Sequence, residues 1–152
     1  MPASEVKIRT ARPGDLGEML ALLKLLFTIE ADFRIDSARQ ERGLSLLLGS
    51  PRSVVLAAEA GNGVVGMVTG QLVISTSEGA PSLWAEDLVV NPAWQGQGIG
   101  RRLMAAVAEW AAKHGATRLQ LLVDQGNETG QAFHRRIGYE LTRMICMRKH
   151  QD

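Results

Sequence analysis

The sequence predicts a mixed α/β fold in which a mostly antiparallel sheet packs against four helices. The length of 152 residues fits one domain, and a composition of 45% hydrophobic and 22% charged residues is typical of globular proteins. Helical and alternating apolar patterns follow one another in the order β-α-α-β-β-β-α-β-α-β. No internal repeat or linker interrupts them, so we expect a single domain over residues 1–152.

The chain is expected to begin with a strand over residues 6–9 and a helix over residues 16–27, whose apolar residues share one face. Asp15, with Glu18 three residues later, has the form of a capping box at the start of this helix. These patterns therefore give the first β-α unit.

A second helix is predicted over residues 37–48, where Asp36 can cap the start and Gly49 the end. Val-rich runs at residues 53–59 and 64–76 flank a Gly-Asn-Gly sequence, which is typical of a hairpin turn. The middle of the chain is thus expected to form an antiparallel hairpin.

The C-terminal half continues with strands and helices in alternation. We expect a strand over about residues 82–90, a helix over 99–114, a strand over 119–123, a helix over 127–137 and a closing strand over 139–148.

Composition excludes several classes of protein. Seventeen Lys and Arg against sixteen Asp and Glu leave a net charge of +1, so no basic field draws the chain to nucleic acid or to a membrane surface, and we expect neither as a partner. The one cysteine, Cys146, cannot form an intramolecular disulfide and is expected in the core of the closing strand. The three histidines show no zinc spacing, so no metal site is expected.

The location of the protein is expected to be cytoplasmic. The N-terminal residues are charged and rich in turn formers, without the apolar core of a secretory signal. The longest apolar helix is interrupted by Glu18 and Lys24 and is too short to span a bilayer.

The most informative stretch covers residues 86–101, which read EDLVVNPAWQGQGIGR. A strand ends, three glycines follow and a helix begins, so free backbone N–H groups and the positive end of the helix dipole converge on one place. Glycine lets phosphate oxygens approach the backbone and permits positive φ. This pattern favours a diphosphate ligand; the alternative is a glycine turn without a ligand.

Two well-known phosphate loops do not fit. The dinucleotide fingerprint requires glycine where Arg101 stands, and the Walker A sequence is absent. The spacing Gln/Arg-x-x-Gly-x-Gly/Ala is met by Gln95, Gly98 and Gly100, and the loop resembles the acetyl-CoA pyrophosphate loop of the GNAT superfamily of N-acetyltransferases. This resemblance implies acetyl-CoA as cofactor, held by Leu88, Val89, Val90, Gln95, Gly96, Gln97, Gly98, Ile99, Gly100 and Arg101.

A second segment resembles the family signature Asn-x-x-Ala-x-x-Leu-Tyr-x-x-x-Gly-Phe. It contains Asn127, Gly130, Phe133, His134, Gly138 and Tyr139. The resemblance implies that Asn127, Gly130 and Phe133 contact the pantetheine arm; the alternative for Asn127 is a helix N-cap. His134 stands where the family usually has a tyrosine that protonates the departing thiolate, so it is either a proton donor or sulfur contact, or an ordinary surface histidine.

An ammonium group must lose a proton before its nitrogen can attack a thioester, and a carboxylate can accept that proton. Glu86 is the favoured base, because the Glu-Asp pair is similar to that of polyamine-type acetyltransferases. Asp87 points the other way in a regular strand, and a bulge would reverse this. Ordered water is the remaining alternative.

The acceptor is expected to bind between the first two helices, where the family has its acceptor groove. The segment there carries Glu30, Asp32 and Phe33, which could hold a cation. The alternative is a solvated turn in which Asp36 caps a helix and Arg34 neutralises a neighbour.

The leading functional hypothesis is acetyl-CoA-dependent acetyl transfer to a primary amine, favoured to be a small molecule, by direct attack on the thioester. The alternatives are acetylation of a protein or peptide N-terminus or lysine, and a non-catalytic acyl-CoA-binding domain, which the missing tyrosine favours. The resemblance also makes a homodimer possible.

Overall fold

The computed structural model describes residues 5–29, 34–61 and 63–151. The chain forms two compact units, Met1–Leu122 and Val123–Asp152. The expected fold class is confirmed, since the first unit holds a mixed sheet with helices on it and the second adds one more helix. That all of the chain forms one domain stays a prediction.

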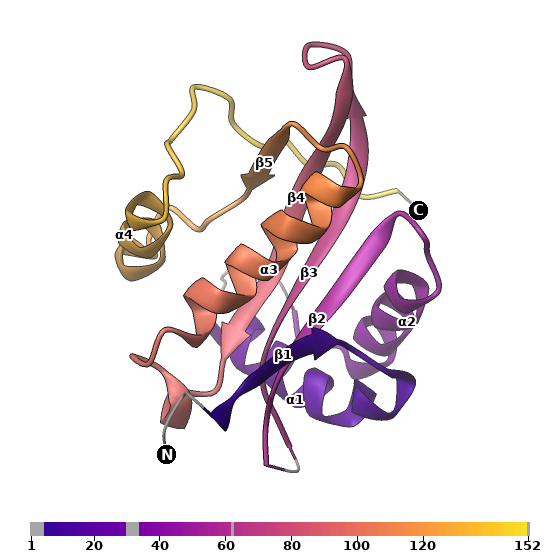
Figure 1. Cartoon of the computed structure of the whole chain (residues 1–152), viewed down its shortest axis with the longest axis vertical. Coiled ribbons are helices and arrows are strands. Elements are labelled where there is room, and N and C mark those ends of the chain that lie inside the picture. The colour runs from indigo at the N-terminus through magenta and orange to yellow at the C-terminus, as the bar shows by residue number, and fades with distance from the viewer. Residues whose placement is uncertain (1–4, 30–33, 62, 152) are drawn as a thin grey trace. The chain divides into compact units, whose positions relative to one another are not determined.

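The sheet of the first unit has five strands in the order β1-β2-β3-β4-β5 (Figure 1). Neighbours from β1 to β4 are antiparallel, whereas β5 pairs parallel to β4. The strands are β1 Lys7–Thr10, β2 Ser53–Ala60, β3 Gly63–Ser75, β4 Ala80–Val90 and β5 Arg118–Leu121. The helices α1 and α3 pack against the long β3 and β4, and α2 packs against β2.

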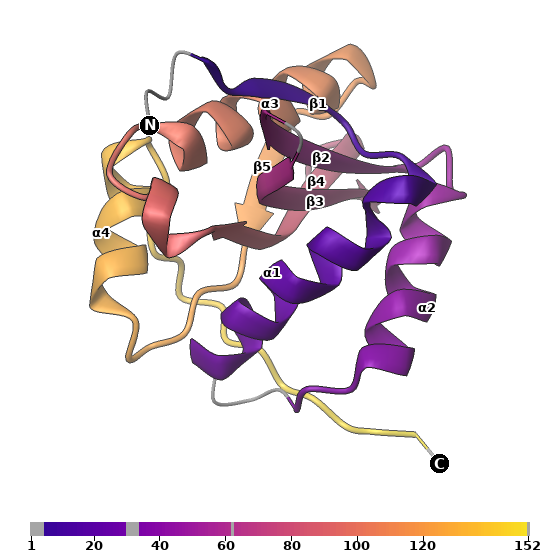
Figure 2. The ribbon, with the colours of Figure 1, turned by 90° about the horizontal axis from the view of Figure 1, so that it is seen from below.

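Helices cover both faces of this sheet. Figure 2 shows α3 on one face, and α1 and α2 on the other. The helices of this unit are α1 Leu16–Ile29, α2 Ser37–Leu48 and α3 Ile99–Lys113. Two cores result because each helix presents an apolar face to the sheet: Met19 and Leu44 are buried on one side, and Leu103 and Val107 on the other.

The ends of α2 follow the sequence prediction. The Asp36 side chain accepts a hydrogen bond from the Arg39 N–H at 3.2 Å, and Gly49 is the C-cap. A capping carboxylate and a terminal glycine satisfy backbone groups that the helix leaves unpaired.

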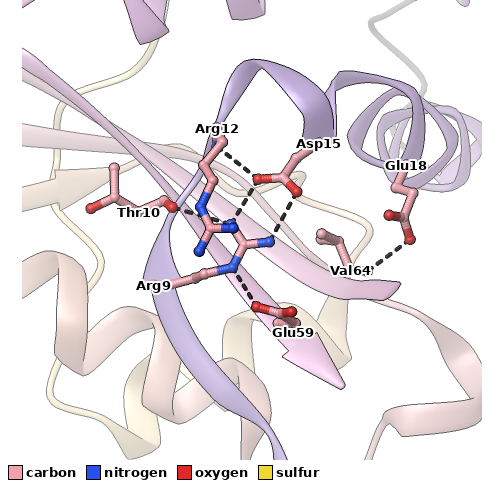
Figure 3. Close-up of polar contacts among 7 residues, drawn as sticks. All are labelled: Arg9, Thr10, Arg12, Asp15, Glu18, Glu59 and Val64. Carbon is pink, nitrogen blue, oxygen red and sulfur yellow. Dashed lines mark hydrogen bonds and ion pairs between the residues drawn. The ribbon is translucent and has the colours of Figure 1, made fainter. Parts of the chain in front are cut away.

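The start of α1 differs from the expected capping box (Figure 3). The Asp15 carboxylate accepts hydrogen bonds from the guanidinium of Arg9 on β1 at 2.7 and 2.9 Å and from the Arg12 N–H at 2.7 Å, while Arg9 also bonds Glu59 on β2. Glu18 instead accepts from the Val64 N–H at 2.8 Å. Long-range partners outweigh the local cap, so these carboxylates fasten α1 to the sheet.

The second unit contains α4, Glu128–Arg136, and a C-terminal segment without the expected closing strand. Residues 139–151 have no strand assigned, and Met144, Ile145 and Met147 are exposed. Cys146 is exposed too, so its expected core position was wrong. Alternating apolar residues form a strand only where a neighbouring backbone supplies hydrogen bonds, and no ladder is assigned to this segment.

Among the described residues, no helix combines the length and apolar character needed to cross a lipid bilayer.

Candidate active site

The loop between β4 and α3 has the conformation that its glycines predict. After a 3-10 turn over Pro92–Trp94, Gly96 has φ 77° and Gly98 has φ 82°. A Cβ atom built on either glycine would meet no atom within 4 Å, so the positive φ, and not crowding, is what requires glycine here. The space beside this backbone is open to a ligand.

This loop has the features expected of an anion-binding site. Gly98 is the N-cap of α3, whose first N–H groups have no partner within the helix, and the side chain of Ile99 is buried beneath them. The Gln95 amide donates to the Val90 carbonyl at 2.9 Å and thereby ties the loop back to the end of β4. Backbone donors at a helix start are suited to anionic oxygens.

A β-bulge interrupts β4 just before this loop. Thr69 of β3 pairs with Glu86 and Met67 pairs with Val89, so β4 carries one residue more than β3 at this point. Asp87 has φ 56°, a left-handed conformation that few non-glycine residues adopt. The bulge breaks the alternation of side chains along β4. It is the irregularity that would turn Asp87 to the same face as Glu86.

Glu86 and Asp87 consequently line one groove of about 480 Å³. Its other walls come from α1, α2 and the neighbouring strands. The apolar lining residues are Leu23, Phe27, Leu44, Leu46 and Leu47, and the polar ones include Gln40, Ser50, Ser53 and Gln71. A predominantly apolar groove with a few polar groups is the usual form of a small-molecule site.

The two carboxylates have different surroundings. Glu86 is exposed, whereas Asp87 is partly buried and accepts a hydrogen bond from the Thr69 hydroxyl at 2.9 Å. Burial raises the pKa of Asp87 to about 6; the Thr69 hydrogen bond opposes this rise, and the negative charge of Glu86 adds to it. A group with such a pKa can both hold and release a proton near neutral pH.

In the second unit, Asn127 is the N-cap of α4. Its side-chain oxygen accepts from the Gly130 N–H at 2.9 Å, which confirms the capping alternative. A Cβ atom at Gly130 would lie 2.4 Å from the Asn127 amide nitrogen, so a larger residue there would require the Asn127 side chain to shift. That Asn127, Gly130 and Phe133 bind the cofactor stays a prediction.

His134 lies near the end of α4. Its ring makes edge contacts with Phe133 and Tyr139, at centroid distances of 5.1 and 5.7 Å, and the buried Nδ1 has no hydrogen-bond partner. Burial lowers the pKa of His134, so the imidazole is neutral at pH 7. A neutral ring can donate an N–H bond but carries no surplus proton, and its role toward the sulfur stays a prediction.

The first unit thus brings together the carboxylate pair, the end of β4 at Leu88, Val89 and Val90, and the glycine loop that follows. Glu30, Asp32 and Phe33 lie outside the described residues. Sequence reasoning missed Thr69, which is 1% exposed. A polar residue within the apolar run of β3 was the signal that could have found it.

Comparison with known proteins identifies the family. The sequence profile of the Acetyltransferase (GNAT) family matches residues 19–139. The chain is 31% identical over 148 residues to an aminoglycoside N(6')-acetyltransferase type 1 of Stenotrophomonas maltophilia, which covers 95% of this chain and 93% of that protein. It is 29% identical over 156 residues to a streptothricin acetyltransferase of Streptomyces lavendulae, with 90% and 82% covered.

Solved structures agree on the fold. An aminoglycoside N-acetyltransferase in complex with CoA superposes with a TM-score of 0.81 at 18% identity, covering 97% of this chain and 95% of that one.

The chain belongs to the GNAT family of acetyltransferases. It is an acyltransferase whose cofactor is acetyl-CoA. Within residues 5–29, 34–61 and 63–151, no cluster of three or more His, Cys, Asp or Glu side chains is arranged to hold a metal ion.

Proposed function

We propose that the protein transfers the acetyl group of acetyl-CoA to a primary amine of a small molecule, by direct attack of the amine nitrogen on the thioester. The observation that carries the proposal is the groove in which Glu86 and Asp87 stand together on the bulge of β4. An ammonium group is attracted to paired carboxylates and must lose a proton to one of them before it can react.

The position of the groove in the chain supports this reaction. The strand that presents the carboxylates ends at Val90 and leads through the 3-10 turn over Pro92–Trp94 into the glycine loop, so the acceptor groove and the proposed diphosphate site lie on neighbouring segments of the chain. A short rigid connection keeps two reactants in a fixed geometry, which is a large part of enzymatic rate acceleration.

The residues then have separate tasks. The loop over residues 95–101 binds the diphosphate, and the backbone N–H of Val89 or Val90 hydrogen-bonds the thioester carbonyl as its oxygen gains charge. Glu86 is proposed as a catalytic residue that meets the ammonium group of the acceptor and assists its deprotonation. Acetyl-CoA supplies the acetyl carbon that the nitrogen lone pair attacks.

The names of the relatives favour a small acceptor. The aminoglycoside and streptothricin acetyltransferases are named for small molecules. The groove of about 480 Å³ is of a size that fits such molecules. We therefore propose a small-molecule amine in preference to a protein or peptide.

The experiment is an acetylation assay with acetyl-CoA, a thiol reagent to measure released CoA, and a panel of cationic, neutral and acidic primary amines. We expect turnover with cationic amines, and Glu86→Gln should lower kcat/KM because it removes a negative charge that attracts the ammonium group. Glu109→Gln, which neutralises an exposed carboxylate on α3, is the matched control and should change nothing. Acetylation of peptides, together with acetylation of none of the small amines, would contradict the proposal.

A further inference from the structure

We propose that Asp87 is the group that receives the proton of the acceptor's ammonium group, and that the buried hydroxyl of Thr69 is built to hold Asp87 in both of its protonation states. This inference rests on the proposed amine acetylation and assigns within it a role that the sequence favoured giving to Glu86.

The first support is the backbone. Asp87 is the one non-glycine residue with positive φ within the described part of the chain, and such a conformation costs free energy that the surrounding structure must offset. Its effect is to turn the Asp87 carboxylate to the same groove as Glu86 and not to the opposite face of the sheet. Strained backbone that aims a charged group into a groove is typical of catalytic sites.

The second support is the hydrogen-bond geometry at Thr69. Its Oγ1 lies 2.9 Å from Asp87 Oδ2 and 3.2 Å from the backbone carbonyl oxygen of Glu86. A hydroxyl has a single hydrogen and cannot donate to both oxygens at once. When Asp87 is ionised, Thr69 donates to the carboxylate.

The backbone carbonyl oxygen of Glu86 gives the Thr69 hydroxyl a second acceptor. When Asp87 is protonated, its O–H donates to Thr69 Oγ1, and the Thr69 hydrogen turns to the Glu86 carbonyl. Rotation about the Cβ–Oγ bond is the only movement required, so Thr69 and Asp87 stay hydrogen-bonded to each other in both protonation states. A merely structural carboxylate needs a partner for one state only.

The third support is electrostatic. Burial keeps the pKa of Asp87 at about 6, above the usual value for an aspartate, and the charge of Glu86 contributes in the same direction. Asp87 is therefore a stronger base than an ordinary aspartate, yet it stays largely ionised at neutral pH and ready to accept a proton. Glu86, which is exposed beside it, can hold the incoming ammonium group.

One proton passes from the ammonium nitrogen to an Asp87 oxygen, and the nitrogen lone pair forms the N–C bond to the acetyl carbon while the C–S bond breaks and sulfur keeps the electron pair. The nitrogen then loses a second proton. Of the two protons released, one neutralises the thiolate and the other leaves to solvent.

The test is the pH dependence of kcat/KM with an amine that the wild-type protein acetylates. We expect the wild-type rate to fall below an inflection near pH 6, and Asp87→Asn to lose roughly 10²-fold or more at pH 7.5 together with that inflection. Asn tolerates positive φ, so a folded variant is expected; circular dichroism and calorimetric CoA binding verify this.

Two further variants should move the inflection in opposite directions. Thr69→Val removes the hydrogen bond that lowers the pKa of Asp87, so the inflection should rise and activity should return at high pH. Glu86→Gln removes a negative charge, so the inflection should fall. Glu109→Gln should leave it unchanged.

A wild-type protein that acetylates no amine would refute the proposed function. An active wild type whose pH profile is unchanged by Asp87→Asn, or by both Thr69→Val and Glu86→Gln, would overturn the role of Asp87 alone.

Discussion

Two aspartates show how surroundings decide what the same side chain does. Asp15 is paired with Arg9, whose hydrogen bonds are the main cause that lowers the pKa of Asp15 to about 2. Asp87 has no cationic partner in its hydrogen bonds, and burial raises its pKa to about 6. Ionised Asp15 therefore stabilises the fold, whereas ionisation of Asp87 lowers the free energy of unfolding. A raised pKa of this kind is common among catalytic acids and bases.

The first residue-scale prediction is that Asp87→Asn stabilises the protein while it lowers activity. The folded state binds the proton more tightly than the unfolded state, so ionisation of Asp87 lowers the free energy of unfolding as the pH rises from about 4 through about 6. Asn removes this cost, and we expect a gain of about 1–3 kcal/mol at pH 8.

Urea unfolding at pH 8 and pH 5 measures this gain, which should shrink at the lower pH. A variant that is less stable than the wild type at pH 8 would show that the ionised Asp87 is well satisfied in the fold.

The second residue-scale prediction concerns acid stability. Because the folded pKa of Asp15 is depressed from 3.8 to about 2, its stabilisation is present above pH 4 and is lost as the pH falls toward 2. Asp15→Asn should lower the free energy of unfolding by about 2 kcal/mol at pH 7. Denaturant curves at pH 7 and pH 2.5 should show that the difference shrinks in acid; an equal loss at both pH values would assign it to packing.

At the scale of elements, the glycine loop and the start of α3 are predicted to bind CoA together. Gly98→Val should weaken CoA binding at least tenfold, about 1.4 kcal/mol, because valine avoids φ 82° and would displace the backbone donors at the start of α3. Calorimetric titration with CoA measures this effect. Gly17→Ala on α1 is the control, since Gly17 is exposed and its added Cβ meets no atom within 4 Å. Unchanged affinity in folded Gly98→Val would remove this site.

The segment between α1 and α2 is expected to select the acceptor through Glu30 and Asp32. Asp32→Lys should raise KM for a cationic amine, and the increase should shrink with added salt because screening weakens the repulsion. Steady-state kinetics at low and high salt test this. A KM that neither Asp32→Lys nor Glu30→Lys changes at low salt would show that the segment does not select the substrate.

Elements that depend on local chemistry could be predicted from the sequence, and those that depend on distant partners could not. The ends of α2 follow from Asp36 and Gly49, which act on their own helix. The predicted capping box of α1 was wrong because the Asp15 carboxylate accepts hydrogen bonds from Arg9, which lies on another element. The bulge at Asp87 arises from the register between β4 and β3. The apolar periodicity along β4 alone carries no information about that register.

For the whole molecule, the order of elements up to α4 followed from apolar periodicity, and the family followed from two short motifs. The groove did not, because its walls come from α1, α2 and three strands that lie far apart in the sequence. Thr69 is separated from Asp87 by 18 positions, so its contact could only be seen in the fold. The prediction of a closing strand was wrong for a related reason, since strand formation requires hydrogen bonds from a neighbouring backbone.

Direct transfer of the acetyl group to an amine can be tested by incubating the protein with acetyl-CoA before any amine is added. Intact-protein mass and released CoA are then followed before and after addition of an amine that is turned over. We expect an unmodified protein and no CoA release at first, followed by N-acetylated amine and free CoA in equal amounts. A burst of CoA release with an acetylated protein before the amine is added would contradict direct transfer.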